Sequence, residues 1–364
     1  MIKVLHTEWS DGWGGQEIRI ISEMKAVRNL GIYVALACRD KSKIKEQALK
    51  NNFEVFVVPF KGNYHIPTII KLIKLIKEHE FNIINTHSGK DSWTGGIAAK
   101  LAGAKFIRTR HLSNKINPSR FNFINELADF VMTTGESVRL NMIKNNRILP
   151  EKVLSVPTGI DSTLFNPINF NRDKERKRYG IDKGEVAIGI IAVLREFKRH
   201  EMFIDMAEKV SEIFPQCKFF IAGEGPRKGI IKSMIKEKDL KEKVILLGHI
   251  SNPYNLLSAL DISILTSDKN EGVPQSVIQA LMMNKPVIAT DVGSTKDLLK
   301  NNNFILLEPN NLPQLIKAVS LLINNKKLRE NYSQKARASV VEIFSEAEMG
   351  NKVIDIYKTI LGAQ

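Results

Sequence analysis

An acidic residue and a glycine stand directly before a predicted helix that runs through residue 279. The first turn of a helix has backbone N–H groups without internal acceptors, and the helix dipole adds partial positive charge there. The turn through Val273, Pro274 and Gln275 is therefore a candidate site for the diphosphate of a nucleotide. Glu271 and Gln279 lie eight positions apart, and we expect them to hold two ends of one ligand.

The segment 271–293 resembles the core of the retaining nucleotide-sugar glycosyltransferases of family 4, which have the two-lobed GT-B fold. That family carries a Glu-x7-Glu motif followed by Pro-Val-Ile-Ala-Thr-Asp-x-Gly, and the second run stands at 286–293. In the family the first Glu contacts hydroxyls of the donor sugar and the second binds the ribose. The resemblance implies the first role for Glu271, whereas Gln279 replaces the second Glu. Since an amide both accepts and donates, we expect Gln279 to bind the ribose more weakly by about 1–2 kcal/mol.

A glycine pair lies between the first predicted strand and the helix that follows it. Gly14 and Gly15 allow a ligand to approach the backbone, and the start of a helix favours an anion. The pair resembles the amino-terminal Gly-Gly loop that lies beside the donor diphosphate in family 4. The loop lacks the three spaced glycines of a dinucleotide-binding turn, which disfavours a dehydrogenase.

Two histidines each follow the end of a predicted strand. Because the carboxyl ends of parallel strands meet at one edge of a sheet, we expect His87 and His111 to converge there. His111 matches the family histidine that lies against the reacting sugar, so the resemblance gives it a catalytic role together with Glu271. The amino-terminal lobe of such proteins generally holds the acceptor. Candidates for acceptor contacts are therefore His87, Ser88, Asp91 and Trp93.

Basic residues follow the first predicted strand of the second half. Cations at this place would neutralise the charge that grows on a departing diphosphate. Lys198 matches the family lysine, whereas Val193 stands where the family has an arginine. If the strand continues, Arg195 shares a face with Val193 and supplies the missing guanidinium. Further along, backbone atoms at the position of Ile250 read the nucleotide base in the family.

Short apolar runs alternate with longer helical patterns along the whole chain, which predicts parallel sheets covered by helices on both faces. The fold class is therefore α/β, with two doubly wound, Rossmann-like domains facing each other across a cleft. We predict an acceptor-side domain over 1–165, a donor-side domain over 166–344, and a last helix over 345–364 that crosses back to the first domain. The predicted strands are 2–5, 34–37, 55–58, 83–85, 106–108, 130–133, 153–156, 186–193, 219–222, 244–247, 262–265, 287–289 and 305–307.

Composition narrows the class of protein further. The chain has 364 residues with 43% hydrophobic and 26% charged side chains, enough for two cores of ordinary size. Two cysteines argue against a disulfide framework or a cysteine metal site. No apolar run approaches the length of a membrane-spanning helix, and no leader precedes the first predicted strand. We therefore expect a cytoplasmic enzyme that requires no metal and no cofactor.

The net charge of +15 suits a phosphate-bearing substrate or the anionic inner face of the cytoplasmic membrane, and it can also reflect base composition. We expect no nucleic-acid partner. The basic amphipathic segment 66–79 resembles an interfacial helix, although a crossover helix must also lie at this place. Residues for a second lipid contact are Lys115, Arg120, Phe121, Asn122 and Phe123.

These features together predict a metal-independent, retaining glycosyltransferase that uses a UDP-, GDP- or ADP-sugar. The expected acceptor is a hydroxyl of a glycan or of a lipid-linked sugar, in the synthesis of bacterial lipopolysaccharide or another cell-surface polysaccharide. Two alternatives stay open at this stage. One is a GT-B nucleotide-sugar 2-epimerase, and the other is a catalytically degenerate module that binds an anionic polymer or membrane.

Overall fold

The computed structural model describes residues 1–111, 119 and 123–362, and these form two compact units. One unit comprises Met1–Gly159 and Glu346–Gln364, and the other comprises Ile160–Ser345. The division falls before the expected boundary at 165, because Ile160 and Phe165 both pack into the core of the second unit. The backbone N–H of Ile160 also donates to the carbonyl of Phe344 at 2.8 Å. The lipid-contact candidates Lys115, Arg120, Phe121 and Asn122 lie outside the described residues.

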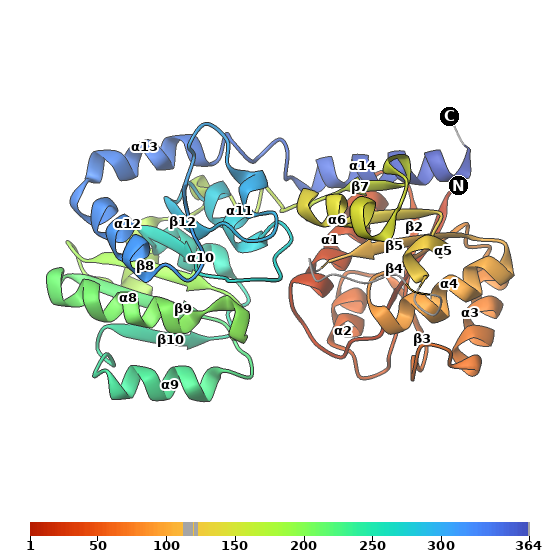
Figure 1. Cartoon of the computed structure of the whole chain (residues 1–364), viewed down its shortest axis with the longest axis horizontal. Helices are drawn as coiled ribbons and strands as arrows, with labels where there is room; N and C mark the ends of the chain where they lie inside the picture. Colours follow the sequence, from red (N-terminus) through yellow and green to blue (C-terminus); the bar gives the residue numbers. More distant parts are fainter. Residues whose placement is uncertain (112–118, 120–122, 363–364) are drawn as a thin grey trace. The chain divides into compact units, whose positions relative to one another are not determined.

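The described part of the first unit is built on a parallel sheet in the order β3-β2-β1-β4-β5-β6-β7, drawn from red to yellow in Figure 1. Its strands are β1 (Lys3–Glu8), β2 (Tyr33–Cys38), β3 (Glu54–Val57), β4 (Ile83–Thr86), β5 (Lys105–Arg110), β6 (Phe130–Thr133) and β7 (Val153–Ser155). Its helices are α1 (Gly15–Asn29), α2 (Lys43–Lys50), α3 (Ile66–His79), α4 (Gly89–Ala102), α5 (Ile124–Leu127), α6 (Glu136–Asn146), η1 (Pro150–Lys152) and α14 (Glu346–Leu361).

The second unit has a parallel sheet in the order β10-β9-β8-β11-β12-β13. Its strands are β8 (Val186–Ile191), β9 (Cys217–Ala222), β10 (Val244–Gly248), β11 (Ile262–Leu265), β12 (Val287–Thr290) and β13 (Ile305–Leu307). Its helices are α7 (Arg172–Arg178), α8 (His200–Ile213), α9 (Lys228–Glu237), α10 (Pro253–Ala259), α11 (Gln275–Met282), α12 (Leu312–Asn324) and α13 (Lys326–Ala336). Short 3-10 turns are η2 (Pro167–Asn169), η3 (Glu196–Lys198) and η4 (Thr295–Leu298).

Both strand orders confirm the expected α/β class with two doubly wound sheets. Each apolar run that the sequence analysis marked coincides with a strand, because strands buried on both faces are apolar almost throughout. The direction of winding reverses between β1 and β4 in the first sheet and between β8 and β11 in the second. Loops that leave the carboxyl ends of strands at such a reversal form the usual ligand site of open α/β sheets.

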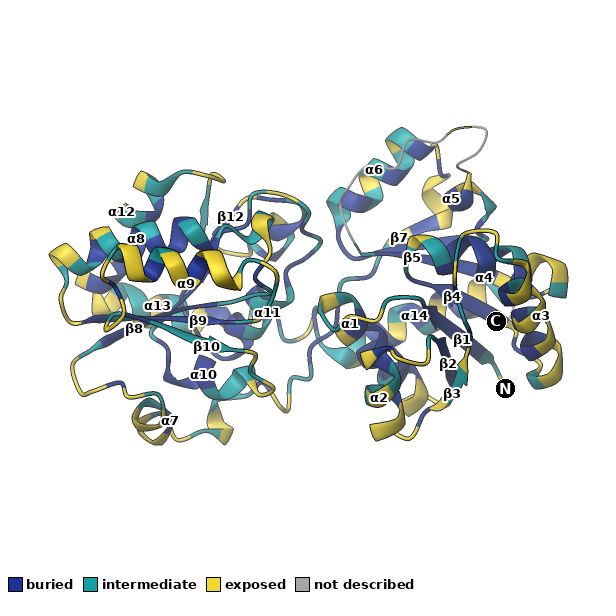
Figure 2. Ribbon diagram, turned by 90° about the horizontal axis from the view of Figure 1, so that it is seen from below, coloured by how far each residue is buried: buried dark blue, intermediate teal, exposed yellow. Residues whose placement is uncertain are grey.

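Helix α3 buries one side and exposes the other. Leu72, Leu75 and Ile76 are buried in the core of the first unit, as a crossover helix requires. Ile66 and Ile70, in contrast, are 67% and 61% exposed. Figure 2 shows this mixture of dark and yellow segments along α3. The apolar face of the segment is thus core, and membrane contact through α3 stays a prediction.

Helix α14 packs against α1 within the first unit. Gly350 permits the close approach, because a Cβ placed there would meet the Cβ of Ala26 at 3.1 Å. Tyr357 of α14 is fully buried in the same core. The carboxyl-terminal segment therefore completes the covering of the first sheet, although it follows the second unit in sequence.

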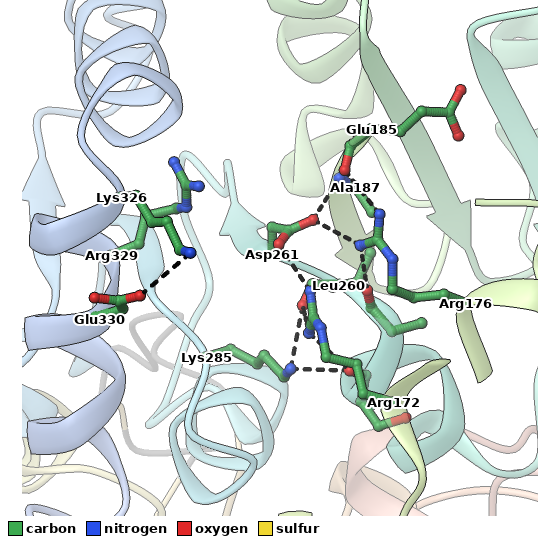
Figure 3. Close-up of polar contacts among 12 residues, drawn as sticks. Arg172, Arg176, Glu185, Ala187, Leu260, Asp261, Lys285, Lys326, Arg329 and Glu330 are labelled. Carbon is green, nitrogen blue, oxygen red and sulfur yellow. Dashed lines mark hydrogen bonds and ion pairs between the residues drawn. The ribbon is translucent and has the colours of Figure 1, made fainter. Parts of the chain in front are cut away.

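A charged cluster joins the amino ends of β8 and β11 in the second unit, at the edge opposite the loops considered below (Figure 3). The carboxylate of Asp261 contacts Arg172 at 2.7 Å and Arg176 at 2.9 Å, and it accepts the backbone N–H of Ala187 at 2.8 Å. Lys285 and Arg172 both donate to backbone carbonyls at the end of α10. Burial lowers the pKa of Lys285 to about 7. These cations satisfy carbonyls that the helix cannot pair internally.

We expect Asp261→Ala to lower the free energy of unfolding by about 2–3 kcal/mol, because it leaves two guanidinium groups without their shared carboxylate. Urea unfolding followed by circular dichroism measures the change. Glu212→Ala is the control, because Glu212 pairs with Lys209 on an exposed helix surface and should contribute nothing measurable. Equal stability of Asp261→Ala and the parent protein would show that the cluster is not a stabilising one.

Candidate functional site

A polar cluster surrounds Glu8 at the carboxyl end of β1. The buried carboxylate accepts hydrogen bonds from the backbone N–H of Ser10 at 2.7 Å, from Ser88 Oγ at 2.8 Å and from Gln16 Nε2. Gln16 also donates to Ser88 Oγ at 2.7 Å, so the loop after β1 is tied to the loop after β4. Burial raises the pKa of Glu8. The cluster holds the start of α1 against the start of α4.

The glycine pair lies at the amino end of α1, beside this cluster. Gly14 donates its backbone N–H to Glu17 Oε2 at 2.8 Å and precedes the first residue of the helix, Gly15. Its φ of −163° is extended backbone that any residue adopts. A Cβ at Gly14 would also meet Glu17 only at 3.6 Å, an ordinary contact. The structure thus places the pair at a helix start, as predicted, and gives no conformational reason for glycine at position 14.

Three histidines form a continuous chain at the carboxyl edge of the first sheet. His6 Nδ1 lies 3.0 Å from His87 Nε2, and His87 Nδ1 lies 3.0 Å from His111 Nε2. The structure therefore brings His87 and His111 together as the sequence predicts, and it adds His6 of β1. Burial lowers the pKa of His6 to about 3 and holds the pKa values of His87 and His111 well below the usual range. All three rings are neutral at physiological pH.

Besides His87, whose ring is buried in the histidine chain, two of the four acceptor candidates are interior residues. Asp91 is fully buried, and its carboxylate accepts Thr7 Oγ1 at 2.8 Å and the backbone N–H groups of His87 and Ser88 at 2.9 Å. Burial, and after it the charge of Glu8, raises the pKa of Asp91 well above its usual value. Asp91 thus caps α4 and positions His87.

Trp93, the other interior candidate, is 6% exposed and packs against Tyr64 and Phe123. Its ring belongs to the core of the first unit, so an acceptor cannot reach it without rearrangement. Acceptor contact stays a prediction for His87 and Ser88, of which only Ser88 is partly exposed, since both ring nitrogens of the buried His87 are bonded to His6 and His111.

In the second unit a buried ion pair joins two carboxyl-end loops. Lys198 Nζ lies 2.5 Å from Glu271 Oε1, with side chains only 15% and 8% exposed. Ser267 Oγ donates to the same oxygen at 2.5 Å. Both bonds use Oε1, and no described residue forms a hydrogen bond or ion pair with Oε2, so this oxygen can accept a ligand hydroxyl. The structure thus brings together Lys198 and Glu271, which the sequence analysis selected separately.

Glycines allow the loops around this pair to interlock. Gly293 has φ +61°, and a Cβ there would lie 2.0 Å from the carbonyl oxygen of Glu271. Gly223 and Gly225 also have positive φ, and a Cβ at either would strike the carbonyl oxygen of Ala192 or of Leu194, respectively. The backbone that carries Glu271 is therefore fixed by direct contact with the loop after β12.

Arg195 does not lie on a continued strand, so that part of the expectation is wrong. Strand β8 ends at Ile191, and Arg195 is the exposed residue that precedes η3. Beyond Ile191 the backbone still follows its neighbour, because the N–H groups of Ala192 and Leu194 donate to the carbonyls of Ala222 and Glu224 at 3.0 Å. A diphosphate contact by Arg195 stays a prediction that depends on its long side chain.

The remaining donor candidates lie around α11 and β10. Pro274 precedes the first helical residue, Gln275, so the turn does lie at a helix start. Val273 faces the core, and only its backbone is available to a ligand. Gln279 is half-buried one turn inside α11, and Ile250 follows the end of β10. These positions agree with the predicted edge of the sheet, whereas the assigned contacts stay predictions.

The sequence analysis missed His6, Glu8, Gln16 and Ser267. A signal existed for the first two, because His6 and Glu8 are polar residues that closely follow the predicted strand 2–5, where a ligand site of an α/β sheet is expected. Gln16 had none, since Ser88 lies far away in sequence, whereas Ser267 stands only four residues before Glu271 and its hydroxyl was overlooked. Within the described ranges, no group of three or more His, Cys, Asp or Glu side chains is arranged to hold a metal ion.

Comparison with known proteins supports the same class. The family model described as Glycosyltransferase Family 4 matches residues 13–164, and the model of glycosyl transferases group 1 matches residues 171–339. Over 98% of its length the chain is 24% identical to an Escherichia coli UDP-Gal:alpha-D-GlcNAc-diphosphoundecaprenol alpha-1,3-galactosyltransferase, of which it covers 96%. The chain belongs to the family 4 glycosyltransferases of the GT-B fold.

Solved structures share the fold over nearly the whole chain. A glycosyltransferase from Rickettsia africae superposes with a TM-score of 0.88 at 23% identity, covering 99% of this chain and 98% of its own. The Anabaena protein HepE in complex with UDP-glucose gives a TM-score of 0.86 at 19% identity, covering 99% and 100%. Among the described residues of the present chain, no helix is both long and apolar enough to cross a membrane.

Gly293→Ala should lower the free energy of unfolding by at least about 2 kcal/mol, because the new Cβ collides with the Glu271 carbonyl at a backbone angle that L-residues avoid. Gly229→Ala is the matched control. It lies in α9 with open space around it, so it should stabilise the protein by about 0.5–1 kcal/mol. Chemical denaturation measures both variants. A Gly293→Ala protein as stable as the parent would refute the interlocking of the two loops.

Proposed function

We propose that this glycosyltransferase transfers a sugar from a nucleoside diphosphate to a hydroxyl of a glycan or lipid-linked acceptor, with retention of the anomeric configuration. The observation that carries the proposal is the Lys198–Glu271 pair with Ser267 beside the start of α11. A carboxylate fixed through one oxygen can accept a sugar hydroxyl through the other. The start of a helix next to it suits a diphosphate.

The proposed reaction accounts for every bond and proton without a metal or a separate strong base. The bond between the anomeric carbon and the phosphate oxygen breaks, and the bond to the acceptor oxygen forms on the same face. The acceptor proton passes to the departing phosphate oxygen. Lys198 and the helix-start amides stabilise the negative charge that grows there, and Arg195 adds to them when its side chain extends inward. Glu271 orients the sugar hydroxyls, which keeps the reacting atoms aligned.

We propose uridine diphosphate as the donor nucleotide and a lipid-linked saccharide as the acceptor. The name of the Escherichia coli relative contains both a UDP-sugar donor and a diphosphoundecaprenol-linked sugar acceptor. A Staphylococcus aureus relative, 30% identical over 177 residues, is named a poly(ribitol-phosphate) alpha-N-acetylglucosaminyltransferase. The basic charge of +15 suits such phosphate-bearing acceptors. The product would be a cell-surface polysaccharide, lipopolysaccharide included. The enzyme would act without a metal in the cytoplasm, at the inner face of the membrane.

Glu271→Ala should reduce kcat by a factor of about 10² to 10³, because the sugar loses its fixed acceptor and Lys198 loses its partner. Release of UDP from UDP-sugars in the presence and absence of a lipid-diphosphate acceptor measures the rate. Glu237→Ala, an exposed position on α9, is the control and should retain full activity. Release that does not depend on acceptor would favour the 2-epimerase. A protein whose melting temperature no nucleotide sugar raises at millimolar concentration would be a binding module.

Gln279→Glu should leave turnover intact and tighten donor binding up to about tenfold, because a carboxylate adds a charge-assisted hydrogen bond to the ribose. Isothermal titration with UDP-sugar and with UDP measures the affinity. Gln314→Glu on α12, remote from α11 in sequence, is the control for the added charge. A large loss of affinity in Gln279→Glu would show that the amide contacts a group that a carboxylate repels.

A further inference from the structure

We propose that His6, His87 and His111 form one tautomeric chain that fixes the proton of His111 on Nδ1. His6, which lies at the far end of the chain, is then a positioning residue for His111. The chain makes His111 a hydrogen-bond donor, and not an acceptor, toward an oxygen of the bound sugar. The identity of that ligand rests on the proposed function, whereas the tautomer of each ring does not.

The geometry leaves each shared nitrogen pair only one proton. The two N···N distances are 3.0 Å, the length of an ordinary hydrogen bond. The rings of His6 and His87 are nearly parallel, at 9°, and those of His87 and His111 are inclined by 39°. The three residues come from β1, from the loop after β4 and from the end of β5, so the sheet itself sets their spacing.

Neutral rings make the chain directional. A neutral imidazole has one N–H and one lone pair, so His87 must donate in one of its two bonds and accept in the other. Both bonds therefore run in the same sense. One end of the chain consequently presents an N–H and the opposite end presents a lone pair. The sense is decided where the chain ends at His6.

The buried surroundings of His6 decide the sense. His6 is fully buried, and its Nε2 has no hydrogen-bond partner among the described residues. The guanidinium of Arg19 is also fully buried, and its charge acts on the His6 ring. A positive charge favours a lone pair facing it over an N–H. An orphaned buried N–H is in addition rarer than an unused acceptor.

Accordingly, His6 has its proton on Nδ1 and donates to His87 Nε2, and His87 Nδ1 donates to His111 Nε2. The proton of His111 is then on Nδ1, the nitrogen that the chain does not use. Arg19 is itself held by Glu23 at 3.1 Å, and Glu23 accepts Asn85 Nδ2 at 3.0 Å. The orientation of the cation is therefore fixed by α1 and β4.

Long-range ¹H–¹⁵N correlation spectra of the full chain, labelled at histidine, test the proposal directly. The protein has seven histidines, and single substitutions assign each signal to its residue. At pH 7.5 we expect the Nδ1 atoms of His6, His87 and His111 to have the shift of a protonated nitrogen and their Nε2 atoms that of an unprotonated one. A protonated Nε2 on His111, or a doubly protonated ring, would overturn the proposal. This measurement needs no substrate.

Variants of His6 test its positioning role. His6→Phe removes the hydrogen bond that stabilises the lone pair on His87 Nε2, so His111 should lose its single tautomer and populate Nε2–H beside Nδ1–H, and kcat/KM should fall by up to about tenfold at unchanged UDP affinity. His6→Asn places an amide near the lost Nδ1 and should restore both readouts. His65→Asn, at the start of α3, is the control and should change neither.

The spectra and the activity test the histidine chain and the proposed transferase function separately. An unchanged His111 spectrum in His6→Phe would refute the chain whatever the activity. Expected tautomers in a protein that turns over no nucleotide sugar would leave the chain standing and would refute the proposed function.

Discussion

The ion pair between Lys198 and Glu271 is the interaction on which the arrangement of the second unit's loops depends. It joins the turn after β8 to the loop between β11 and α11, and Ser267 of that same loop adds a hydrogen bond to the carboxylate. Removing one partner would leave a charge in a nearly closed environment. The contact of Gly293 with the Glu271 backbone makes the same position rigid from the opposite side. A carboxylate so constrained is preorganised for a ligand, which is what electrostatic catalysis requires.

The first unit reaches a comparable rigidity without exposed charge. Besides the buried carboxylate of Glu8, the carboxyl ends of its strands carry three neutral imidazoles in series, and the charge of the buried Arg19, paired with Glu23, acts on the first of them. The carboxylate of Asp91 accepts the backbone N–H groups of His87 and of Ser88, the residue that precedes α4. The two units thus place different chemistry at equivalent edges of similar sheets. One edge presents directed neutral hydrogen bonds, and the other presents a compensated ion pair beside a helix start.

The sequence was sufficient for the strands and for the residues that follow them. Buried parallel strands are apolar throughout, so their positions were visible. His87 and His111 stand directly after two of them, and Lys198 and Glu271 lie in the loops that follow two others. Side-chain direction was not visible. Asp91 and Trp93 have the composition of a binding site, yet burial assigns them to capping and core packing. Partners distant in sequence, such as Ser88 with Gln16, follow from tertiary packing alone, and no local pattern reports them.

The central claim is that the chain transfers a sugar to an acceptor hydroxyl with its anomeric configuration retained. The most direct test is proton NMR of the product formed from a UDP-α-sugar and a lipid-diphosphate saccharide acceptor. The account predicts acceptor-dependent appearance of one new anomeric proton with the small coupling constant of an α-linkage, together with stoichiometric UDP. A β-linked product, or UDP release without any new glycosidic bond, would contradict it.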